Sequence, residues 1–253
     1  MTINTPKASH VPVLRRLMKS AFGESEEFLD KFFTVAFSPE RARVALEGDE
    51  IVAALYWFDC EYLGLRTAYL YAIATDAAHR GHGFGSLLVL DTVKHLSSLG
   101  YDSVLLVPAN PSLFGFYEKL GFKKASGIEE FSAEASGQNI SISEISKEAY
   151  SAKRASLIPV GAVIEEDAIL SLLEGDLKFY TGEDFLLLAR QNGEQLIVAE
   201  LLGNTKKASD ILSSLGCKEG LFRTAGSGRD FTMYLPLTAK SVPPTYFGIA
   251  LDI

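Results

Sequence analysis

The spacing of hydrophobic residues over the first 125 positions predicts alternating helices and strands. Residues 9–22 and 26–37 place apolar side chains every three or four positions, which is the spacing of one buried helix face. Residues 67–75 form an uninterrupted aromatic and aliphatic run, which is typical of a strand. The predicted elements, in chain order, are helices at 9–22 and 26–37, two strands within 42–58, a strand at 67–75, a helix opened by the glycine-rich segment 79–85 and closed by Gly100, a strand at 102–107, a short helix from 111 to 120 and another strand after Phe122.

The remaining half of the chain predicts a second set of helices and strands. Residues 126–138, SGIEEFSAEASGQ, are rich in Ser, Ala, Glu and Gly and are interpreted as the internal boundary. The sequence therefore predicts two domains, 1–137 and 138–253. The elements predicted beyond the boundary are strands at 139–146, 219–223, 230–236 and 245–252, helices near 147–156, 163–174 and 205–215, and a hairpin at 184–202 that turns at QNGE.

A short internal repeat links the two halves. Leu-Ser-Ser-Leu-Gly occurs at 96–100 and again at 212–216, each time at the end of a helix that follows a strong strand. Thr75 ends the first strand 21 residues before Leu96, whereas Leu202 ends the second strand 10 residues before Leu212. The repeat favours a duplication in which the second copy has lost about 11 residues, while an unrelated accessory α+β domain remains the alternative.

Composition excludes several classes of protein. The chain of 253 residues is 47% hydrophobic and 22% charged, which is typical of globular domains, and its formal charge of −8 disfavours nucleic acid and anionic membranes as partners. No apolar stretch approaches the roughly 18 residues of a membrane span, and the N-terminus does not resemble a secretory signal. Two distant cysteines and four histidines show no zinc spacing, so we expect no metal and a reducing cytoplasm.

The segment RGHGFGS at 80–86 carries the clearest chemical signal. It lies between a predicted strand and a predicted helix, and its alternating glycines allow positive φ angles and close approach of a ligand to the backbone. The free N–H groups and the dipole of the following helix favour an anion, most naturally a phosphate group. The dinucleotide fingerprint fails because Ser86 occupies its third glycine position, and no Gly-Lys-Ser/Thr follows for a P-loop.

The same segment resembles motif A of the GNAT superfamily of N-acetyltransferases, [Q/R]-x-x-G-x-[G/A], with Arg80, Gly83 and Gly85 at the defining positions. Upstream, AYLYAIATDAAHR is similar to the splayed fourth strand of that family. Downstream, Asn110 and FYEKLGF at 116–122 are similar to its next strand end and its short cofactor-facing helix. The resemblance covers about the first half of the chain. It implies an α/β (α+β) fold with a mixed central sheet flanked by helices, followed by a smaller degenerate GNAT-like or accessory domain.

The resemblance also implies roles for individual residues. Ile73 and Thr75 would pair through their backbone with the pantetheine arm of acetyl-CoA, and an N–H near Ile73 would polarise the thioester carbonyl. Asn110 would contact the pantetheine arm, and Tyr117 would protonate the departing thiolate. Backbone N–H groups of one segment would hold the pyrophosphate, namely those of Arg80, Gly81, His82, Gly83, Phe84, Gly85 and Ser86.

The acceptor side is less defined by the sequence. Glu61 and Tyr71 lie on or beside strands that should border the acceptor groove, although the sequence favours a solvated carboxylate and a packed tyrosine over a lining role. Trp57 would roof the groove, and packing in the core explains it equally well. Tyr117 without its motif would be read as a core ring with a surface hydroxyl. No motif identifies the general base that deprotonates the acceptor.

We therefore expect an acetyl-CoA-dependent N-acetyltransferase that acts by direct transfer on the primary amine of a small molecule or peptide. A non-enzymatic CoA-binding or regulatory module, and an acyltransferase for another acyl group or acceptor, are the alternatives. An aminoglycoside, a polyamine, an amino acid and a protein N-terminus all remain open as acceptors. The second half would complete the acceptor groove or form a homodimer face.

Overall fold

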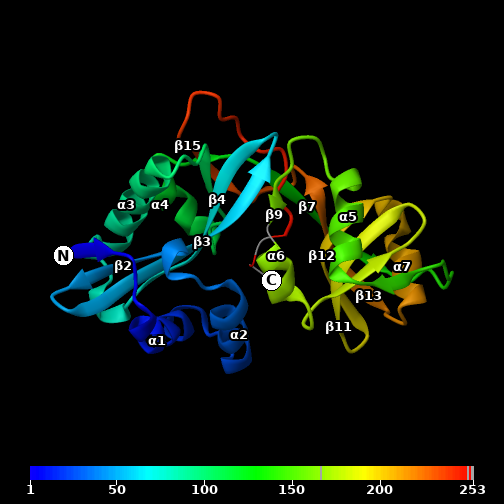
Figure 1. Cartoon of the computed structure of the whole chain (residues 1–253). Helices are drawn as coiled ribbons and strands as arrows, with labels where there is room; N and C mark the ends of the chain where they lie inside the picture. Colours follow the sequence, from blue (N-terminus) through cyan, green and yellow to red (C-terminus); the bar gives the residue numbers. More distant parts are fainter. Residues whose placement is uncertain (166, 250, 252–253) are drawn as a thin grey trace. The chain divides into compact units, whose positions relative to one another are not determined.

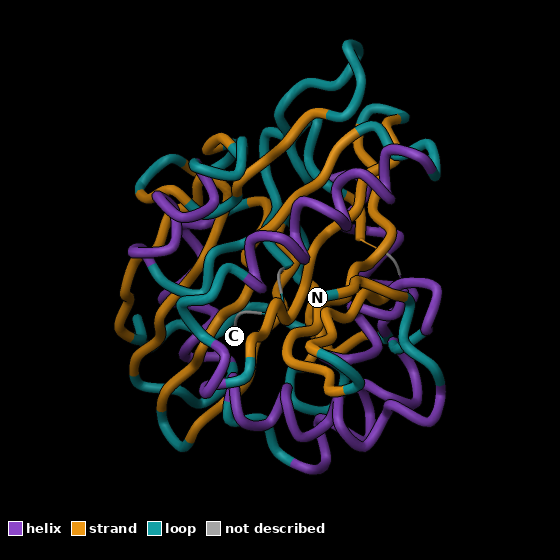
Figure 2. Tube along the Cα trace, turned by 90° about the vertical axis from the view of Figure 1, so that its left-hand side faces the viewer, coloured by secondary structure: helices purple, strands orange, loops and turns teal. Residues whose placement is uncertain are grey.

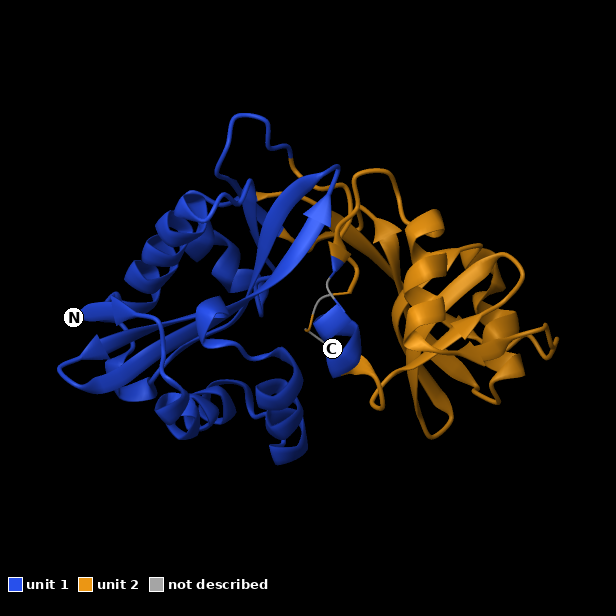
Figure 3. Cartoon of the chain, in the orientation of Figure 1, with its two compact units in different colours: residues 1–123, 165–172, 233–242 blue, residues 124–164, 173–232, 243–253 orange. Residues whose placement is uncertain are grey.

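The computed structural model describes residues 1–165, 167–249 and 251. The chain divides into two compact units, shown in Figure 3. Unit 1 consists of residues 1–123, 165–172 and 233–242, and unit 2 of residues 124–164, 173–232 and 243–253. The division differs from the predicted one, because the expected boundary after residue 137 lies inside unit 2 and because unit 1 takes in two segments of the second half.

Unit 1 begins with two helices joined by a tightly capped connection. Helix α1 (Val11–Phe22) buries Leu14, Leu17 and Met18 and ends at Gly23, whose φ of +76° closes the last turn. Helix α2 (Glu26–Lys31) begins where the Ser25 hydroxyl accepts a hydrogen bond from the Phe28 N–H at 3.0 Å. A π-helical turn, Phe32–Ala36, continues α2, so both predicted helices are confirmed.

The sheet of unit 1 is mixed, as predicted. Its strands run in the order β1-β2-β3-β4-β5-β15-β6, and β4 and β5 pair in parallel while their other resolved pairings are antiparallel. The strands are β1 (Thr2–Asn4), β2 (Ala42–Glu47), β3 (Glu50–Tyr62), β4 (Leu65–Thr75), β5 (Ser103–Leu106), β15 (Met233–Pro236) and β6 (Lys123–Lys124).

Helices cover both faces of this sheet (Figure 1). Helices α3 (Phe84–Ser98) and α4 (Phe114–Glu118) lie on one side, and α1 and α2 lie on the other. Strand β3 serves both cores because successive side chains point to opposite faces. Leu55 and Trp57 pack with Leu88 of α3, whereas the ring of Tyr56 lies 5.1 Å from that of Phe32.

Unit 2 contains a second mixed sheet, in the order β14-β7-β13-β12-β11-β10-β8, and Figure 2 distinguishes its strands from the helices. Its strands are β14 (Arg229–Asp230), β7 (Gly127–Glu134), β13 (Glu219–Gly226), β12 (Gln195–Gly203), β11 (Phe185–Asn192), β10 (Lys178–Thr181) and β8 (Ser143–Ile145). The helices of unit 2 are α5 (Lys147–Leu157) and α7 (Ala208–Ser214). Strand β9 (Ile164–Glu165) pairs with β3 of the first sheet, and most of helix α6 (Asp167–Leu173) belongs to unit 1.

The segment interpreted as a boundary, 126–138, is largely strand β7, so that interpretation was wrong. Phe131 and Ala133 pack on the core of unit 2, where the Phe131 ring stacks on Phe222 at 5.3 Å, and Ile128 is buried on the opposite face of the strand. Ser and Glu occupy the exposed positions between them and make the segment look like a linker. Pairing with β13 along the whole of β7 supplies the backbone hydrogen bonds that composition cannot predict.

The tail predicted as a strand at 245–252 does not form one in the described part of the chain. Tyr246 forms a single isolated bridge with Ala162. Residues 250 and 252 of the predicted strand lie outside the described residues.

The two copies of Leu-Ser-Ser-Leu-Gly adopt the same conformation. Gly100 and Gly216 have φ of +79° and +71°, and their N–H groups bond the Ser97 and Ser213 carbonyls at 3.1 and 3.2 Å. Each copy leads into a strand that pairs in parallel with the strand before its helix, β5 with β4 and β13 with β12.

The final strands of the two halves are exchanged between the sheets. Strand β7 follows α4 in the chain but pairs with β13, and β15 ends the second half but pairs with β5. In the first sheet, the strand beside the parallel pair β4–β5 is β15, from the second half of the sequence. In the second sheet, the strand beside the parallel pair β12–β13 is β7, from the first half.

Candidate functional site

The glycine-rich segment 80–86 turns sharply between β4 and α3. Gly81 and Gly83 both have φ of +82°, a conformation that side chains with a Cβ rarely adopt. The Nε of Arg80 donates a hydrogen bond to the Thr75 carbonyl at 3.2 Å, which ties the turn to the strand end. No side chain caps α3, so its first N–H groups point out of the helix without a capping partner.

The approach to this turn is held by a small polar cluster. The Asp76 carboxylate accepts a hydrogen bond from the Ala78 N–H at 2.9 Å and contacts the His79 ring at 3.2 Å. These two contacts hold the pKa of Asp76 below its usual range. His79 also lies 3.4 Å from the Glu47 carboxylate, so its geometry is that of a structural brace.

A pocket of about 320 Å³ lies at the N-terminus of α3. The residues that line it are Thr75, His79, Arg80, Gly81, Gly83, Phe84, Gly85, Ser86 and Phe116. A Cβ on Gly85 would lie 3.3 Å from the Thr75 hydroxyl, so glycine here permits the close approach of helix and strand. Seven of the ten residues predicted for cofactor binding therefore meet in one pocket, and Ile73, His82 and Asn110 lie outside it.

The end of strand β4 nearest this pocket has no pairing partner on the edge that faces β5. The parallel pairing of the two strands runs from Thr67 with Ser103 to Leu70 with Leu106, and β5 ends there. Across the sheet, Ala72 and Ile73 together oppose the single residue Leu55 of β3, which makes a bulge. Ala72 has φ of +48°, an unusual value for a residue with a side chain.

Asn110 and Tyr117 lie at the end of β5 and in α4. The Asn110 side-chain carbonyl accepts a hydrogen bond from the Ser112 N–H at 3.1 Å and caps the short 3₁₀ turn η5 (Pro111–Leu113). The Tyr117 side chain is buried, with its ring 5.0 Å from Phe116 of the pocket wall and 5.9 Å from Phe122. Burial raises the pKa of the Tyr117 phenol to about 12.

The three residues predicted to line the acceptor groove do not meet. Trp57 is buried in the core under α3 and donates a hydrogen bond to the Tyr101 hydroxyl at 3.2 Å. Tyr71 lies on the opposite face of the sheet, with its ring 5.8 Å from that of Phe32. Glu61 is exposed near the β3–β4 turn. It lies roughly 17 Å along β3 from Tyr56, the residue that pairs with Tyr71, at about 3.3 Å per residue.

Two polar residues beside Tyr71 were missed from the sequence. Glu24 lies in the connection between α1 and α2, and its charge helps to raise the pKa of Tyr71, after burial as the main cause. The Tyr56 hydroxyl is buried and has no hydrogen-bond partner in the described structure. Neither belongs to a motif, and only the pairing of Tyr56 with Tyr71 across the sheet brings them to one place.

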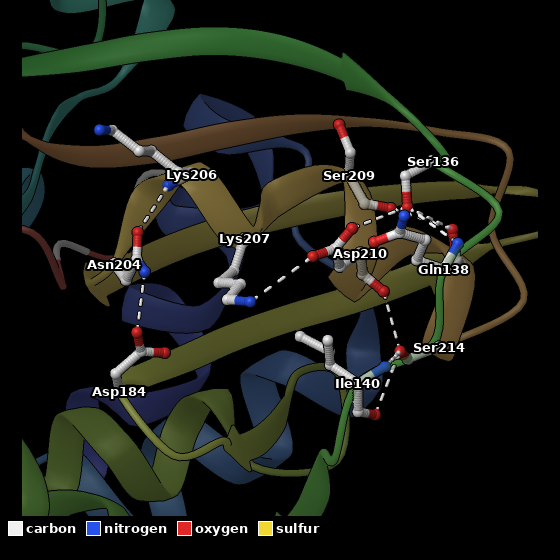
Figure 4. A network of polar contacts seen from close by, with 11 residues as sticks. Ser136, Gln138, Ile140, Asp184, Asn204, Lys206, Lys207, Ser209, Asp210 and Ser214 are labelled. Carbon is white, nitrogen blue, oxygen red and sulfur yellow. Dashed lines mark hydrogen bonds and ion pairs between the residues drawn. The ribbon is translucent and has the colours of Figure 1, made fainter.

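The corresponding turn of unit 2 is built differently (Figure 4). The Asn204 side chain accepts a hydrogen bond from the Lys206 N–H at 3.2 Å and donates one to Asp184 at 2.8 Å. The 3₁₀ turn η6 (Thr205–Lys207) then leads into α7, and Lys207 pairs with Asp210 at 3.7 Å. The Asn204 side chain therefore caps η6, the turn that continues into α7, whereas no side chain caps α7 itself.

Within the described residues, no group of three or more His, Cys, Asp or Glu side chains is placed to hold a metal ion. None of the helices among these residues has the length and apolar character needed to cross a membrane.

Sequence comparison identifies the domain that contains the uncapped helix start, the pocket and the open strand. The model of the acetyltransferase (GNAT) domain family matches residues 2–125. The chain therefore contains a GNAT domain and is an acyltransferase enzyme, as the resemblance of its motif predicted. A search of the curated proteins found no match.

Solved structures share the fold over most of the chain. A GCN5-related N-acetyltransferase from Anabaena variabilis is 13% identical with a TM-score of 0.76, over 94% of this chain and 73% of that one. The corresponding enzyme from Kribbella flavida is 16% identical with a TM-score of 0.70, over 93% and 72%. Eis1 from Mycobacterium abscessus is 14% identical with a TM-score of 0.70, over 95% and 75%. Both halves of this chain thus have counterparts in known folds.

Proposed function

We propose that the protein transfers the acetyl group of acetyl-CoA directly to a primary amine. Three features of unit 1 support the proposal. The unpaired edge of β4 suits the extended, amide-bearing pantetheine arm, and the bulge at Ala72–Ile73 suits the thioester carbonyl. The uncapped N-terminus of α3 suits the pyrophosphate.

Binding of the pyrophosphate is assigned to the α3 turn. Backbone N–H groups at a helix N-terminus attract phosphate through both hydrogen bonds and the helix dipole. The Nε of Arg80 donates its hydrogen bond to the Thr75 carbonyl, so the two terminal nitrogens of the guanidinium group can bind a phosphate oxygen. The pantetheine arm would then extend along β4 past Thr75 and Ile73, with the free amide of Asn110 beside it.

The proposed reaction needs a group that stabilises the oxyanion, an acid that protonates the thiolate and a base that takes a proton from the amine. The amine nitrogen attacks the thioester carbonyl carbon, and an N–H near Ile73 stabilises the oxyanion as negative charge develops. The carbon–sulfur bond then breaks, and Tyr117 gives its proton to the departing thiolate. The surplus proton of the attacking amine passes to a base.

Unit 2 is proposed to be a degenerate copy of this fold without a cofactor site of its own. Its repeat and parallel strand pair support the common origin, and the Asn204 cap takes the place of the glycine-rich turn. Its role would be to complete the acceptor groove or an oligomer interface. The buried thiols of Cys60 and Cys217 suit a reducing compartment, and the cytoplasm is the proposed location.

Turnover of acetyl-CoA with a panel of amines, read by release of free thiol, tests the proposed reaction. We expect acetyl-CoA to be consumed only when a primary amine is present, with one acetylated amine formed per thiol. Competing longer acyl-CoA species should be poorer substrates. Thiol release that never depends on an amine, or a preference for another acyl group, would contradict the proposal.

Substitution of Gly83 by valine should weaken acetyl-CoA binding by well over tenfold, roughly 1.4 kcal/mol or more. A branched side chain resists the φ of +82° and displaces the N–H groups at the start of α3. Calorimetric titration measures the loss and should give one acetyl-CoA per wild-type chain. Gly100→Val is the matched control, because it places the same side chain at φ of +79° at the other end of α3, in open space.

Equal affinity in folded Gly83→Val and Gly100→Val proteins would exclude the α3 turn as the binding site. A stoichiometry near two would show that unit 2 also binds the cofactor.

A further inference from the structure

The connection between α1 and α2 places a carboxylate where no sequence motif marks one. Glu24 lies between Gly23, which closes α1, and Ser25, which caps α2. Both neighbours are fixed by backbone hydrogen bonds, so the position of Glu24 is set by two caps. The side chain is half-buried, which is costly for a charged group without a partner.

Two of the three basic residues of α1 are paired with other carboxylates. Arg15 contacts Glu26 at 2.9 Å and Asp30 at 2.8 Å, and Lys19 contacts Glu26 at 2.5 Å. Glu24 itself has no hydrogen bond or ion pair within the described part of the chain. Burial accordingly raises its pKa above the usual value. The half-buried, unpaired Glu24 carboxylate can therefore accept a cation from outside the chain.

A second unpartnered polar group lies on the same face of the sheet. The Tyr56 side chain is 3% exposed, and its hydroxyl has no hydrogen-bond partner in the described structure. Leaving such a group unsatisfied is unfavourable, so a partner from outside the chain is expected. Tyr56 pairs with Tyr71 across the sheet, α1 packs on β4, and the charge of Glu24 adds, after burial, to the raised pKa of Tyr71.

These groups lie beside the proposed reacting centre. Tyr71 directly precedes the Ala72–Ile73 bulge, which lies about 3 to 7 Å further along the strand at about 3.3 Å per residue. The aromatic rings on this face of the sheet favour a cation, since the negative face of an aromatic ring attracts positive charge. The rings in question are those of Phe32, Phe33, Tyr56 and Tyr71.

We propose that Glu24 binds the ammonium group of the acceptor and takes its surplus proton, with the Tyr56 hydroxyl as a second hydrogen-bonding partner. This inference rests on the proposed acetyl transfer. One proton moves from the ammonium nitrogen to the Glu24 carboxylate, and the freed lone pair attacks the thioester carbonyl at the bulge. The second proton, which the nitrogen loses as the amide forms, replaces the one that Tyr117 gives to the departing thiolate. One uncompensated carboxylate among aromatic rings suits a monoamine with an apolar or aromatic body, rather than a polycation.

Phenethylamine is the probe that tests this site, titrated by calorimetry into protein saturated with CoA so that no turnover occurs. Glu24→Gln should weaken its binding at least tenfold. Glu27→Gln, the same change three residues away at an exposed position, should leave binding unchanged. With acetyl-CoA present, Glu24→Gln should lower kcat/KM for phenethylamine about 100-fold while its affinity for acetyl-CoA stays at the wild-type value.

Thermal melting at pH 7 separates this role from a structural one. Because Glu24 is a half-buried carboxylate without a partner, its replacement by Gln should leave the melting temperature unchanged or raise it. Wild-type binding of phenethylamine by Glu24→Gln, or no binding by the wild type, would overturn the inference. If the wild type transfers acetyl groups and Glu24→Gln does so equally well, only the role of Glu24 fails. If amine binding depends on Glu24 but acetyl-CoA is never consumed, only the proposed reaction fails.

Discussion

A chain that ends after residue 137 is expected to be insoluble. Such a fragment lacks β15, which pairs with β5 from Met233 opposite Leu106 to Pro236 opposite Ser103. Every residue of β5 is buried, so the loss turns a central strand into an exposed edge. The fragment also retains β7 without its partner β13. Two unpaired strands and the apolar surface around them should cause aggregation.

The fraction of soluble protein after expression, measured by sedimentation and size-exclusion chromatography, tests this expectation. A matched variant joins residues 1–125 through a flexible linker to residues 231–242, which restores β15 and removes β7. This variant should recover part of the soluble fraction. A soluble and fully active 1–137 fragment would show instead that the second half is an independent accessory domain.

Replacement of Tyr117 by phenylalanine is expected to lower kcat about 10²-fold, with little change in the KM for acetyl-CoA. The substitution removes one hydroxyl and retains the ring that packs against Phe116 and Phe122. The loss should therefore be confined to the transition state, in which the thiolate needs a proton. Steady-state kinetics at saturating amine measures both constants.

The pH dependence provides a second readout for the same residue. Because burial raises the pKa of Tyr117 to about 12, the phenol keeps its proton throughout the neutral and mildly alkaline range. The wild-type rate should therefore show no loss of this acid below about pH 11, one unit under that value. Tyr234→Phe is the control, since it removes a hydroxyl from β15 that bonds only Ser241 in its surroundings. A wild-type rate for Tyr117→Phe at every pH would assign the proton to water or another group.

Local sequence patterns predicted most elements of unit 1 and the turn that holds the candidate site. Helical spacing is a short-range feature, because it depends on residues within one or two turns of chain. The segment 80–86 was found for the same reason. Glycines, a strand before them and a helix after them are adjacent in the sequence, and they are also adjacent in the pocket.

Positions that depend on strand pairing were not predictable in this way. The sequence placed Trp57 and Tyr71 together, but the alternation of β3 and β4 sends them to opposite faces of the sheet. Glu24 and Tyr56 are separated by a helix and two strands in the chain. They approach the same tyrosine only because β3 and β4 pair and α1 packs on them.

The sequence by itself thus determined the glycine-rich turn, the repeat at 96–100 and 212–216, and the membership of a GNAT family, since all three are encoded by neighbouring residues. Only the tertiary structure decided where the units divide. Segment 126–138 has the composition of a linker, yet the hydrogen bonds of β13 make it a strand of unit 2, while residues 233–236 complete the sheet of unit 1. Backbone groups of any sequence can satisfy these bonds, so the choice of partner strand depends on which edge the rest of the fold leaves open.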